Sequence, residues 1–339
     1  MTNRSSNGWS RRAFLTTAAL AGTGSLLGLQ SNLSAAEPPP ETTKIKLAQS
    51  PALCTAPQIV ADELLRGEGF TDIQHVKKGS AAVYKAVASG EAQLGMGVTL
   101  AFILEVDAGA PVVLLTGVHV GCYELFGVGR VRSVHDLKGK TVSVPGLGSG
   151  AHALLASMAA YVGLNPGKDI KWVVYPFAES MRLLAEAKID AFMGFPPEPQ
   201  ELRAKKIGHV IVNTITDRPW SQYFCCSIGG NQEFVRKHPS ATKRAVRAIL
   251  RANTICASEP DRVARLLMDR GYATQFDYAS QTIKEIPYGK WREFDSEDTV
   301  RFYSLRLHEA GLIKSSPQKI ISQGTDWRFL KDLKKELKA

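Results

Sequence analysis

The chain has 339 residues, of which 44% are hydrophobic and 22% charged, a composition typical of globular proteins that excludes a disordered or fibrous chain. Its net charge is +10, but no run of Lys and Arg is interleaved with aromatic residues, so nucleic acid is not an expected partner. Five cysteines are too few for a disulfide-rich scaffold, and no apolar run after the N-terminus is long enough to cross a membrane.

The first 36 residues have the pattern of an export signal. The motif SRRAFL at residues 10–15 matches the twin-arginine pattern, and a mildly apolar stretch extends to residue 29. Small residues at 34–36 predict cleavage near Ala36. We therefore expect a twin-arginine signal peptide over residues 1–36 and a mature protein in the periplasm. The alternatives are a mitochondrial presequence or a chance arginine pair.

A Pro-rich linker at residues 37–43 is followed by alternating strand and helix patterns. Strands are expected at residues 44–48, 72–76, 93–98, 112–117, 123–128, 140–144, 170–175, 191–193, 209–212 and 224–228. Helices are expected at residues 57–66, 80–89, 150–162 and 178–188. This alternation predicts an α/β fold with largely parallel sheets.

Two segments 99 positions apart resemble each other, which predicts two lobes of similar construction. ASGEAQLGMG at residues 88–97 and AKIDAFMG at residues 187–194 each end a helix and begin a strand. After Gly229 only helical patterns follow, at residues 240–257, 261–271, 296–311 and 326–337. We expect this helical segment to pack back against one lobe.

Parallel sheets bind ligands beyond the carboxyl ends of their strands, which makes the loops there the candidate site. These loops lie at residues 50–55, 79–80, 97–99, 149–152 and 195–198. Helices that begin at Gly79-Ser80 and at Ser149-Gly150 would direct backbone N–H groups toward an anion, unless these residues only cap their helices. Glu198, in a Pro-rich loop, favours a ligand with a donor or cationic group; alternatively it stabilises its own helix.

Signatures of metal or nucleophilic chemistry are absent from the sequence. It has no HxxxH or CxxC spacing and no GxSxG elbow, and the Gly-rich residues 146–151 do not form GxGxxG. His152 either donates to a ligand or is a partly exposed helix residue. We expect the cysteines to be free thiols that act as small hydrophobic residues, with Cys54 and Cys122 in candidate cleft loops. We therefore expect no metal, no cofactor and no enzymatic activity.

The export signal, the two α/β halves and the helical tail together resemble the periplasmic substrate-binding proteins of ABC importers. More narrowly, the chain resembles the nitrate/sulfonate/taurine-type group, which includes thiamine-pyrimidine binders. The segments that carry the resemblance are KIKLA at 44–48, GS at 79–80, ASGEA at 88–92, DLKGKTV at 136–142 and IDA at 189–191.

The resemblance implies a two-lobed periplasmic-binding-protein type II fold, with a mostly parallel sheet flanked by helices in each lobe. Lobe 1 would contain residues 42–128 plus 225–339 and lobe 2 residues 129–224, joined by crossings near 127–130 and 221–227. The ligand contacts that it implies are Ser50, Cys54, Thr55, Gly79, Ser80, Thr99, Cys122, Tyr123, Ser149, Gly150, Ala151, His152, Glu198 and Tyr223. Cys54 and Cys122 depart from the polar or aromatic residues expected there, which disfavours a simple nitrate site.

The resemblance also implies a function. A monomer would capture a small organic anion (a sulfonate, a carboxylate or a nitrogen-containing analogue) by hinge closure. It would then deliver this ligand to an ABC permease in the cytoplasmic membrane. Two alternatives stay open: a sensor that presents its ligand to a membrane receptor, and an enzyme that resembles the fungal thiamine-pyrimidine synthases.

Overall fold

The computed structural model describes residues 37–79 and 81–337. The signal peptide expected over residues 1–36 and the candidate Ser80 lie outside the described residues. The chain divides into two units, Met1–Pro39 and Pro40–Ala339, and the second contains every helix and strand that is described. Residues 37–43 contain neither, and the first strand begins at Lys44.

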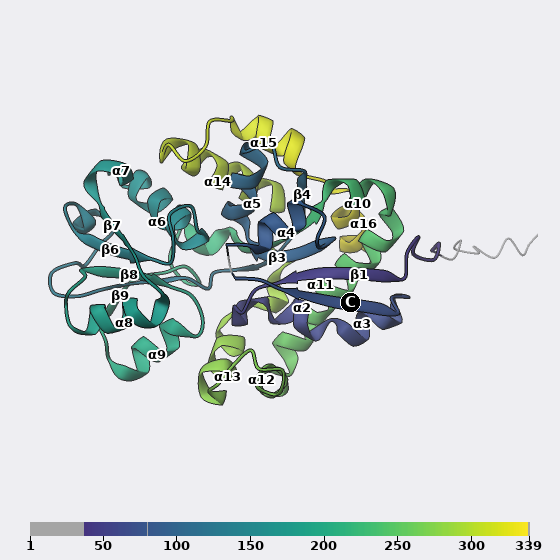
Figure 1. Cartoon of the computed structure of the whole chain (residues 1–339), viewed down its shortest axis with the longest axis horizontal. Helices are drawn as coiled ribbons and strands as arrows, with labels where there is room; N and C mark the ends of the chain where they lie inside the picture. The colour runs from purple at the N-terminus through teal and green to yellow at the C-terminus, as the bar shows by residue number, and fades with distance from the viewer. Residues whose placement is uncertain (1–36, 80, 338–339) are drawn as a thin grey trace, which may run out of the picture. The chain divides into compact units, whose positions relative to one another are not determined.

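The first sheet has the strand order β2-β1-β3-β10-β4 (Figure 1). Its strands are β1 (Lys44–Gln49), β2 (Asp72–Lys77), β3 (Leu94–Val98), β4 (Val112–Val120) and β10 (Phe224–Asn231). β1 runs parallel to β2 and β3, whereas β10 lies antiparallel between β3 and β4. The strands alternate in sequence with helices that cover the sheet, so the predicted α/β class is confirmed.

The second sheet repeats this arrangement, with the order β7-β6-β8-β5-β9. Its strands are β5 (Glu124–Gly127), β6 (Thr141–Val144), β7 (Lys171–Val174), β8 (Ala191–Gly194) and β9 (His209–Asn213). β6 is parallel to β7 and β8, and β5 is antiparallel to β8 and β9. The two similar sequence segments correspond to β3 and β8, which occupy the same place in the two sheets.

The first crossing between the sheets differs from the expected one. Residues 124–127 pair with β8 and β9, so they belong to the second lobe, and the chain crosses at residues 121–123 instead of 127–130. Strand propensity correctly indicates a strand here, but it carries no information about which distant strands will pair with it. The return crossing spans residues 214–223 and leads into β10.

Four helices accompany each half of the chain before the tail. The helices of the first half are α2 (Ala56–Val60), α3 (Asp62–Gly67), α4 (Val83–Ala88) and α5 (Thr99–Asp107). The helices of the second half are α6 (Gly150–Tyr161), α7 (Pro166–Asp169), α8 (Phe177–Ala185) and α9 (Glu198–Lys205). The helix expected at 57–66 is interrupted at Ala61. α5 was not among the predicted helices, because its apolar residues surround the helix and leave no polar stripe.

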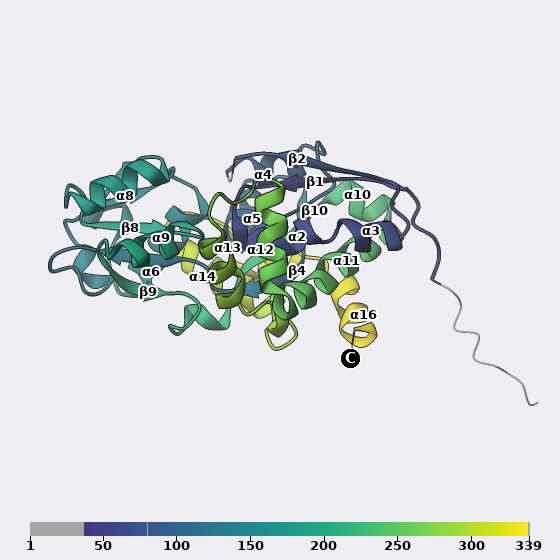
Figure 2. The same cartoon turned by 90° about the horizontal axis from the view of Figure 1, so that it is seen from below.

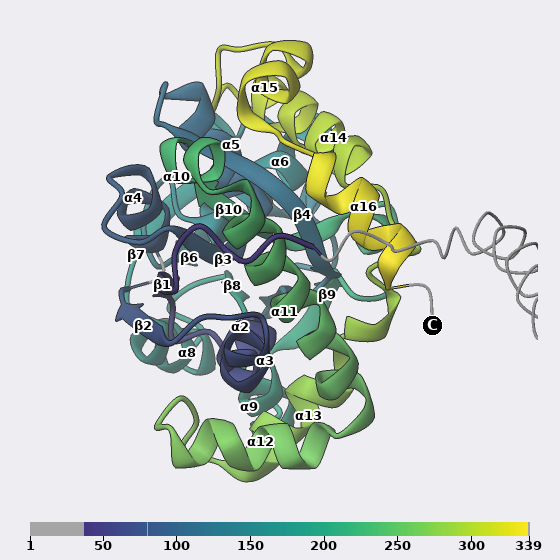
Figure 3. The ribbon, with the colours of Figure 1, turned by 90° about the vertical axis from the view of Figure 1, so that its right-hand side faces the viewer.

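The C-terminal helices contact both lobes (Figures 2 and 3). They are α10 (Gln232–Lys237), α11 (Pro239–Ser258), α12 (Pro260–Asp269), α13 (Phe276–Glu285), α14 (Ser296–Glu309), α15 (Pro317–Gly324) and α16 (Arg328–Glu336). α11 packs on α2 and β4 of the first lobe. α14 contacts α6, and α13 contacts α9. Because α6 and α9 belong to the second lobe, the expectation that the helical segment packs against one lobe is wrong. Within the described residues, no helix is both long and apolar enough to span a bilayer.

Candidate functional site

A partly open cavity of about 40 Å³ lies where the carboxyl ends of β1, β3, β6 and β8 meet. The first two strands belong to one sheet and the last two to the other, so both lobes contribute to its wall. It is lined by Ser50, Ala52, Cys54, Thr55, Ala81, Val83, Tyr84, Met96, Gly97, Val98, Tyr123, Pro145, Ser149, Gly150, Ala151, Phe195 and Cys226. Strand ends of this kind are where α/β sheets bind ligands.

The second lobe contributes the N-terminus of α6 to this cavity. Ser149 is the N-cap, and its Oγ accepts a hydrogen bond from the backbone N–H of His152 at 3.3 Å. A Cβ on Gly150 would lie 3.0 Å from Val98 of the first lobe, so glycine permits the two lobes to approach closely here. The unpaired N–H groups of the first turn provide partial positive charge at the cavity wall.

Buried amides hold the first-lobe loop in place. Gln49 Nε2 donates to Thr55 Oγ1 at 2.8 Å and to the carbonyl of Ser50 at 2.7 Å. Gln58 Nε2 donates to Gln49 Oε1 at 2.7 Å, while its own Oε1 accepts from the Met96 N–H at 2.8 Å. This chain of hydrogen bonds joins the loop after β1 to β3, so the cavity wall is fixed by satisfied polar groups.

The candidates that line the cavity are Ser50, Cys54, Thr55, Tyr123, Ser149, Gly150 and Ala151. Gly79 lines a neighbouring hollow, which shares Tyr84 and Ser149 with the cavity. Tyr84, Met96 and Cys226 also line the cavity but were not among the candidates predicted from the sequence. Tyr84 and Met96 lie on elements next to candidate loops, whereas Cys226 comes from β10, whose place in the sheet no local pattern indicates.

Besides Cys122, three candidates have protein partners and lie outside the cavity lining. Thr99 Oγ1 hydrogen-bonds Ser227 Oγ at 2.7 Å and donates to the Phe224 carbonyl at 2.9 Å, which ties α5 to β10. His152 is buried with its ring edge-on to Trp172. Tyr223 stacks on Phe302, with ring centroids 3.8 Å apart.

Glu198 begins α9 and lines a hollow between α8 and α9, away from the interlobe cavity. Burial raises the pKa of this carboxyl to about 7. Its Oε2 is buried and has no hydrogen-bond partner among the described residues. The side chain is therefore a carboxyl that is about half protonated at neutral pH, and it does not line the cavity.

Cysteines gather on one side of the cavity. The Sγ atoms of Cys122 and Cys225 are 3.1 Å apart, and those of Cys54, Cys122 and Cys226 all lie within 4.8 Å of one another. All are buried and free. Burial raises the pKa of the Cys122 thiol well above its usual range.

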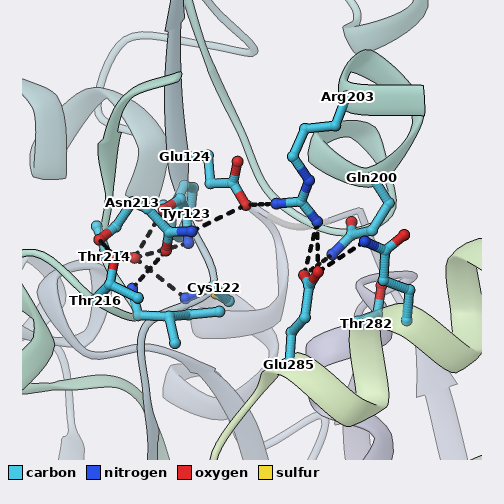
Figure 4. Close-up of polar contacts among 12 residues, drawn as sticks. Cys122, Tyr123, Glu124, Gln200, Arg203, Asn213, Thr214, Thr216, Thr282 and Glu285 are labelled. Carbon is cyan, nitrogen blue, oxygen red and sulfur yellow. Dashed lines mark hydrogen bonds and ion pairs between the residues drawn. The ribbon is translucent and has the colours of Figure 1, made fainter. Parts of the chain in front are cut away.

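A polar cluster joins the lobes beside the cavity (Figure 4). Arg203 of α9 forms an ion pair with buried Glu124 of β5 and another with Glu285 of α13. Burial raises the pKa of Glu124, and the Arg203 charge opposes that rise. Gln200 Nε2 also donates to Glu285 at 3.0 Å.

Comparison with solved structures assigns the class of fold. The periplasmic nitrate-binding protein NrtA from Synechocystis PCC 6803 superposes with a TM-score of 0.74 at 17% identity, covering 89% of this chain and 90% of that one. The aliphatic sulphonate-binding protein SsuA from Escherichia coli gives 0.65 at 17% identity, covering 85% and 94%. At this identity the likeness establishes the fold, and the expected two-lobed periplasmic-binding-protein architecture is confirmed.

Sequence comparison then gives the family. The family model described as "NMT1/THI5 like" matches residues 71–263, and the chain belongs to that family. The bicarbonate-binding protein CmpA of Synechococcus elongatus is 26% identical over 112 residues, which are 32% of this chain and 24% of CmpA. The matched part is about a quarter of that relative's length.

Proposed function

We propose that this chain is the solute-binding component of an ABC importer and that its ligand occupies the interlobe cavity. The observation that carries the proposal is the wall of this cavity, which the two sheets build together at the carboxyl ends of β1, β3, β6 and β8. The similar proteins are named as binding proteins for nitrate, for aliphatic sulphonates and for bicarbonate, all of which are small anions. This similarity supports the same role here.

The proposed ligand is a small organic anion, such as a sulfonate, a carboxylate or a nitrogen-containing analogue. Among the described residues that line the cavity, none has a charged side chain. The anion would therefore be held by neutral hydrogen-bond donors and not by a Lys or Arg side chain. The N–H groups at the start of α6 and the hydroxyls of Ser50 and Ser149 supply donors. Met96 and Phe195 supply apolar contacts for an organic portion.

Ligand binding and lobe closure are coupled in this proposal. A ligand that contacts Ser50 of one lobe and Ser149 of the other makes both contacts only when the lobes are closed. Its differential affinity therefore shifts the population toward the closed state. A permease in the cytoplasmic membrane would recognise that closed state, with the mature chain in the periplasm.

A thermal-shift screen of the purified chain tests the proposal. The panel contains nitrate, bicarbonate, alkanesulfonates, aromatic carboxylates and pyrimidines. A true ligand at 100 times its Kd should stabilise the fold by about 2.7 kcal/mol, and small-angle scattering should show compaction on binding. A chain that no panel member stabilises or compacts would contradict the proposal. A shift in the absorption band of added pyridoxal phosphate on mixing with the chain would favour the enzyme alternative instead.

A further inference from the structure

The sulfur atoms beside the cavity come from three separate parts of the chain. Cys54 follows β1, Cys122 lies in the first crossing and Cys226 lies in β10, yet their Sγ atoms are all within 4.8 Å of one another. The side chains of all three are buried. A tetrahedral ion with metal–sulfur bonds of about 2.3 Å holds its sulfurs about 3.8 Å apart, a spacing that falls within this limit.

The backbone around each thiol is fixed. The Tyr288 hydroxyl donates to the Cys54 carbonyl at 3.1 Å, and Thr214 Oγ1 accepts from the N–H of Cys122 at 3.2 Å. Cys226 pairs with His119 across β4 and β10. Preorganised ligands of this kind lose little conformational freedom when they bind an ion.

A buried imidazole lies on the strand next to Cys226. His119 is completely buried, and its backbone is paired with that of Cys226 across β4 and β10. Its Nδ1 lies 3.2 Å from the Val120 carbonyl, so a proton on Nδ1 leaves the lone pair on Nε2. That Nε2 has no hydrogen-bond partner among the described residues. An unpaired acceptor in the protein interior is costly unless it gains a partner.

We propose that Cys54, Cys122 and Cys226 bind one thiophilic d10 metal ion, Zn(II) or Cu(I), at the side of the interlobe cavity. Sets of thiolates select these ions over hard cations such as Mg²⁺ and Ca²⁺. Each thiol that becomes a ligand releases its proton to solvent, and no electron is transferred. Cu(I) is satisfied by three thiolates, whereas Zn(II) takes a fourth ligand from a further side chain or from water.

Two of the three thiols, Cys54 and Cys226, also line the cavity, so an ion can enter by the route that a solute uses. This inference stands apart from the proposed organic anion, because it requires only that the thiols stay reduced. The competing chemistry is a disulfide between Cys122 and Cys225, whose sulfurs are 3.1 Å apart and which would need a two-electron oxidant.

Metal titration of the reduced full-length chain tests the proposal. Zn(II) and Cu(I) are titrated separately against chromophoric chelators, and X-ray absorption counts the sulfur neighbours of the bound ion. We expect one ion per chain with three sulfur neighbours. Absence of binding by both ions, or an ion bound only through oxygen and nitrogen, would overturn the proposal.

Single variants identify the ligands. Cys54→Ser, Cys122→Ser and Cys226→Ser should each weaken binding by about tenfold or more, because thiolate ligands are lost. Cys256→Ser is the matched control, since Cys256 is a buried free thiol on α11 outside the group, and it should leave the affinity unchanged.

Circular dichroism first establishes that each variant is folded. If a cysteine variant is unfolded, the sulfur count of the unaltered chain still decides the matter. Mass spectrometry of the chain as exported, without added reductant, provides an independent check. A Cys122–Cys225 disulfide in that material would overturn the proposal, and free or metal-bound thiols would support it.

Discussion

One terminal nitrogen of Arg203 donates to both carboxylate oxygens of Glu285, at 2.7 and 2.8 Å (Figure 4). Arg203 belongs to α9 of the second lobe, and Glu285 ends α13, which packs near the first-lobe turn at residues 53–55. The pair is therefore an ionic link between α9 of the second lobe and a helix that packs on the first lobe.

Glu285→Gln should weaken ligand binding by several-fold, because a partly exposed ion pair contributes up to about 1 kcal/mol to the closed state. Isothermal titration calorimetry with the ligand found in the screen measures this change. Glu186→Gln is the control, since Glu186 pairs with Arg182 within α8 and links no lobes. Equal losses in the two variants would contradict a closure role.

Arg203→Met should be more damaging than Glu285→Gln. It leaves the carboxylate of Glu124, which is 3% exposed, without its cation in the protein interior. Removal of one partner from a buried pair costs about 3–5 kcal/mol in stability. Urea denaturation measures the loss, and restoration by a second change, Glu124→Gln, would confirm its electrostatic origin.

Glu198 should make stability depend on pH. Its pKa of about 7 in the folded chain exceeds the ordinary value of 4.5, so the folded state holds a proton that the unfolded chain has released. Between these two values the free energy of unfolding should fall as pH rises, by at most about 1.4 kcal/mol per unit, and then level off above the higher one.

Glu198→Gln should remove this slope and raise stability at about pH 8 relative to the unaltered chain, because the amide stays neutral. Thermal unfolding across the pH range measures it. Glu233→Gln is the control, since Glu233 also lies in the first turn of a helix, but is exposed and paired with Lys237. A parallel pH profile for Glu198→Gln would show that the carboxyl is not the titrating group.

Ser149→Ala should weaken both folding and ligand binding. Loss of the N-cap of α6 costs about 1 kcal/mol of stability, and the cavity loses a hydroxyl. Ser316→Ala is a matched control, because Ser316 caps α15 with the same 3.3 Å hydrogen bond but does not line the cavity. It should lower the stability by a similar amount and leave the calorimetric affinity unchanged.

Gly121→Ala should disturb the crossings more than Gly129→Ala. Both glycines have positive φ, +65° and +60°, so each substitution carries a left-handed strain of about 1–2 kcal/mol. A Cβ on Gly121 would also lie 2.6 Å from the Cα of Ile215, whereas one on Gly129 meets nothing within 4 Å. We expect an additional cost of about 1–3 kcal/mol for Gly121→Ala in denaturant titration. Equal losses of unfolding free energy in the two variants would show that the two crossings move apart to accommodate the added methyl group.

The sequence predicted those parts of the site that depend on local patterns. Ser149 and Gly150 were identified because a helix start has a local signature, and Ser50 and Thr55 because they follow a strand. Cys226 and the contact of Gly150 with Val98 were not, since each depends on strands and lobes brought together from distant parts of the chain. The same reason explains why β5 was recognised as a strand but placed in the wrong lobe.

The position of β10 between β3 and β4 has a consequence for synthesis of the protein. When translation has reached residue 213, every strand of the second sheet exists, but the first sheet still lacks the strand that separates β3 from β4. β3 and β4 can form their hydrogen bonds with β10 only after residue 231 has left the ribosome. The nascent chain should therefore complete its middle portion first, and its amino-terminal portion must wait for sequence made much later.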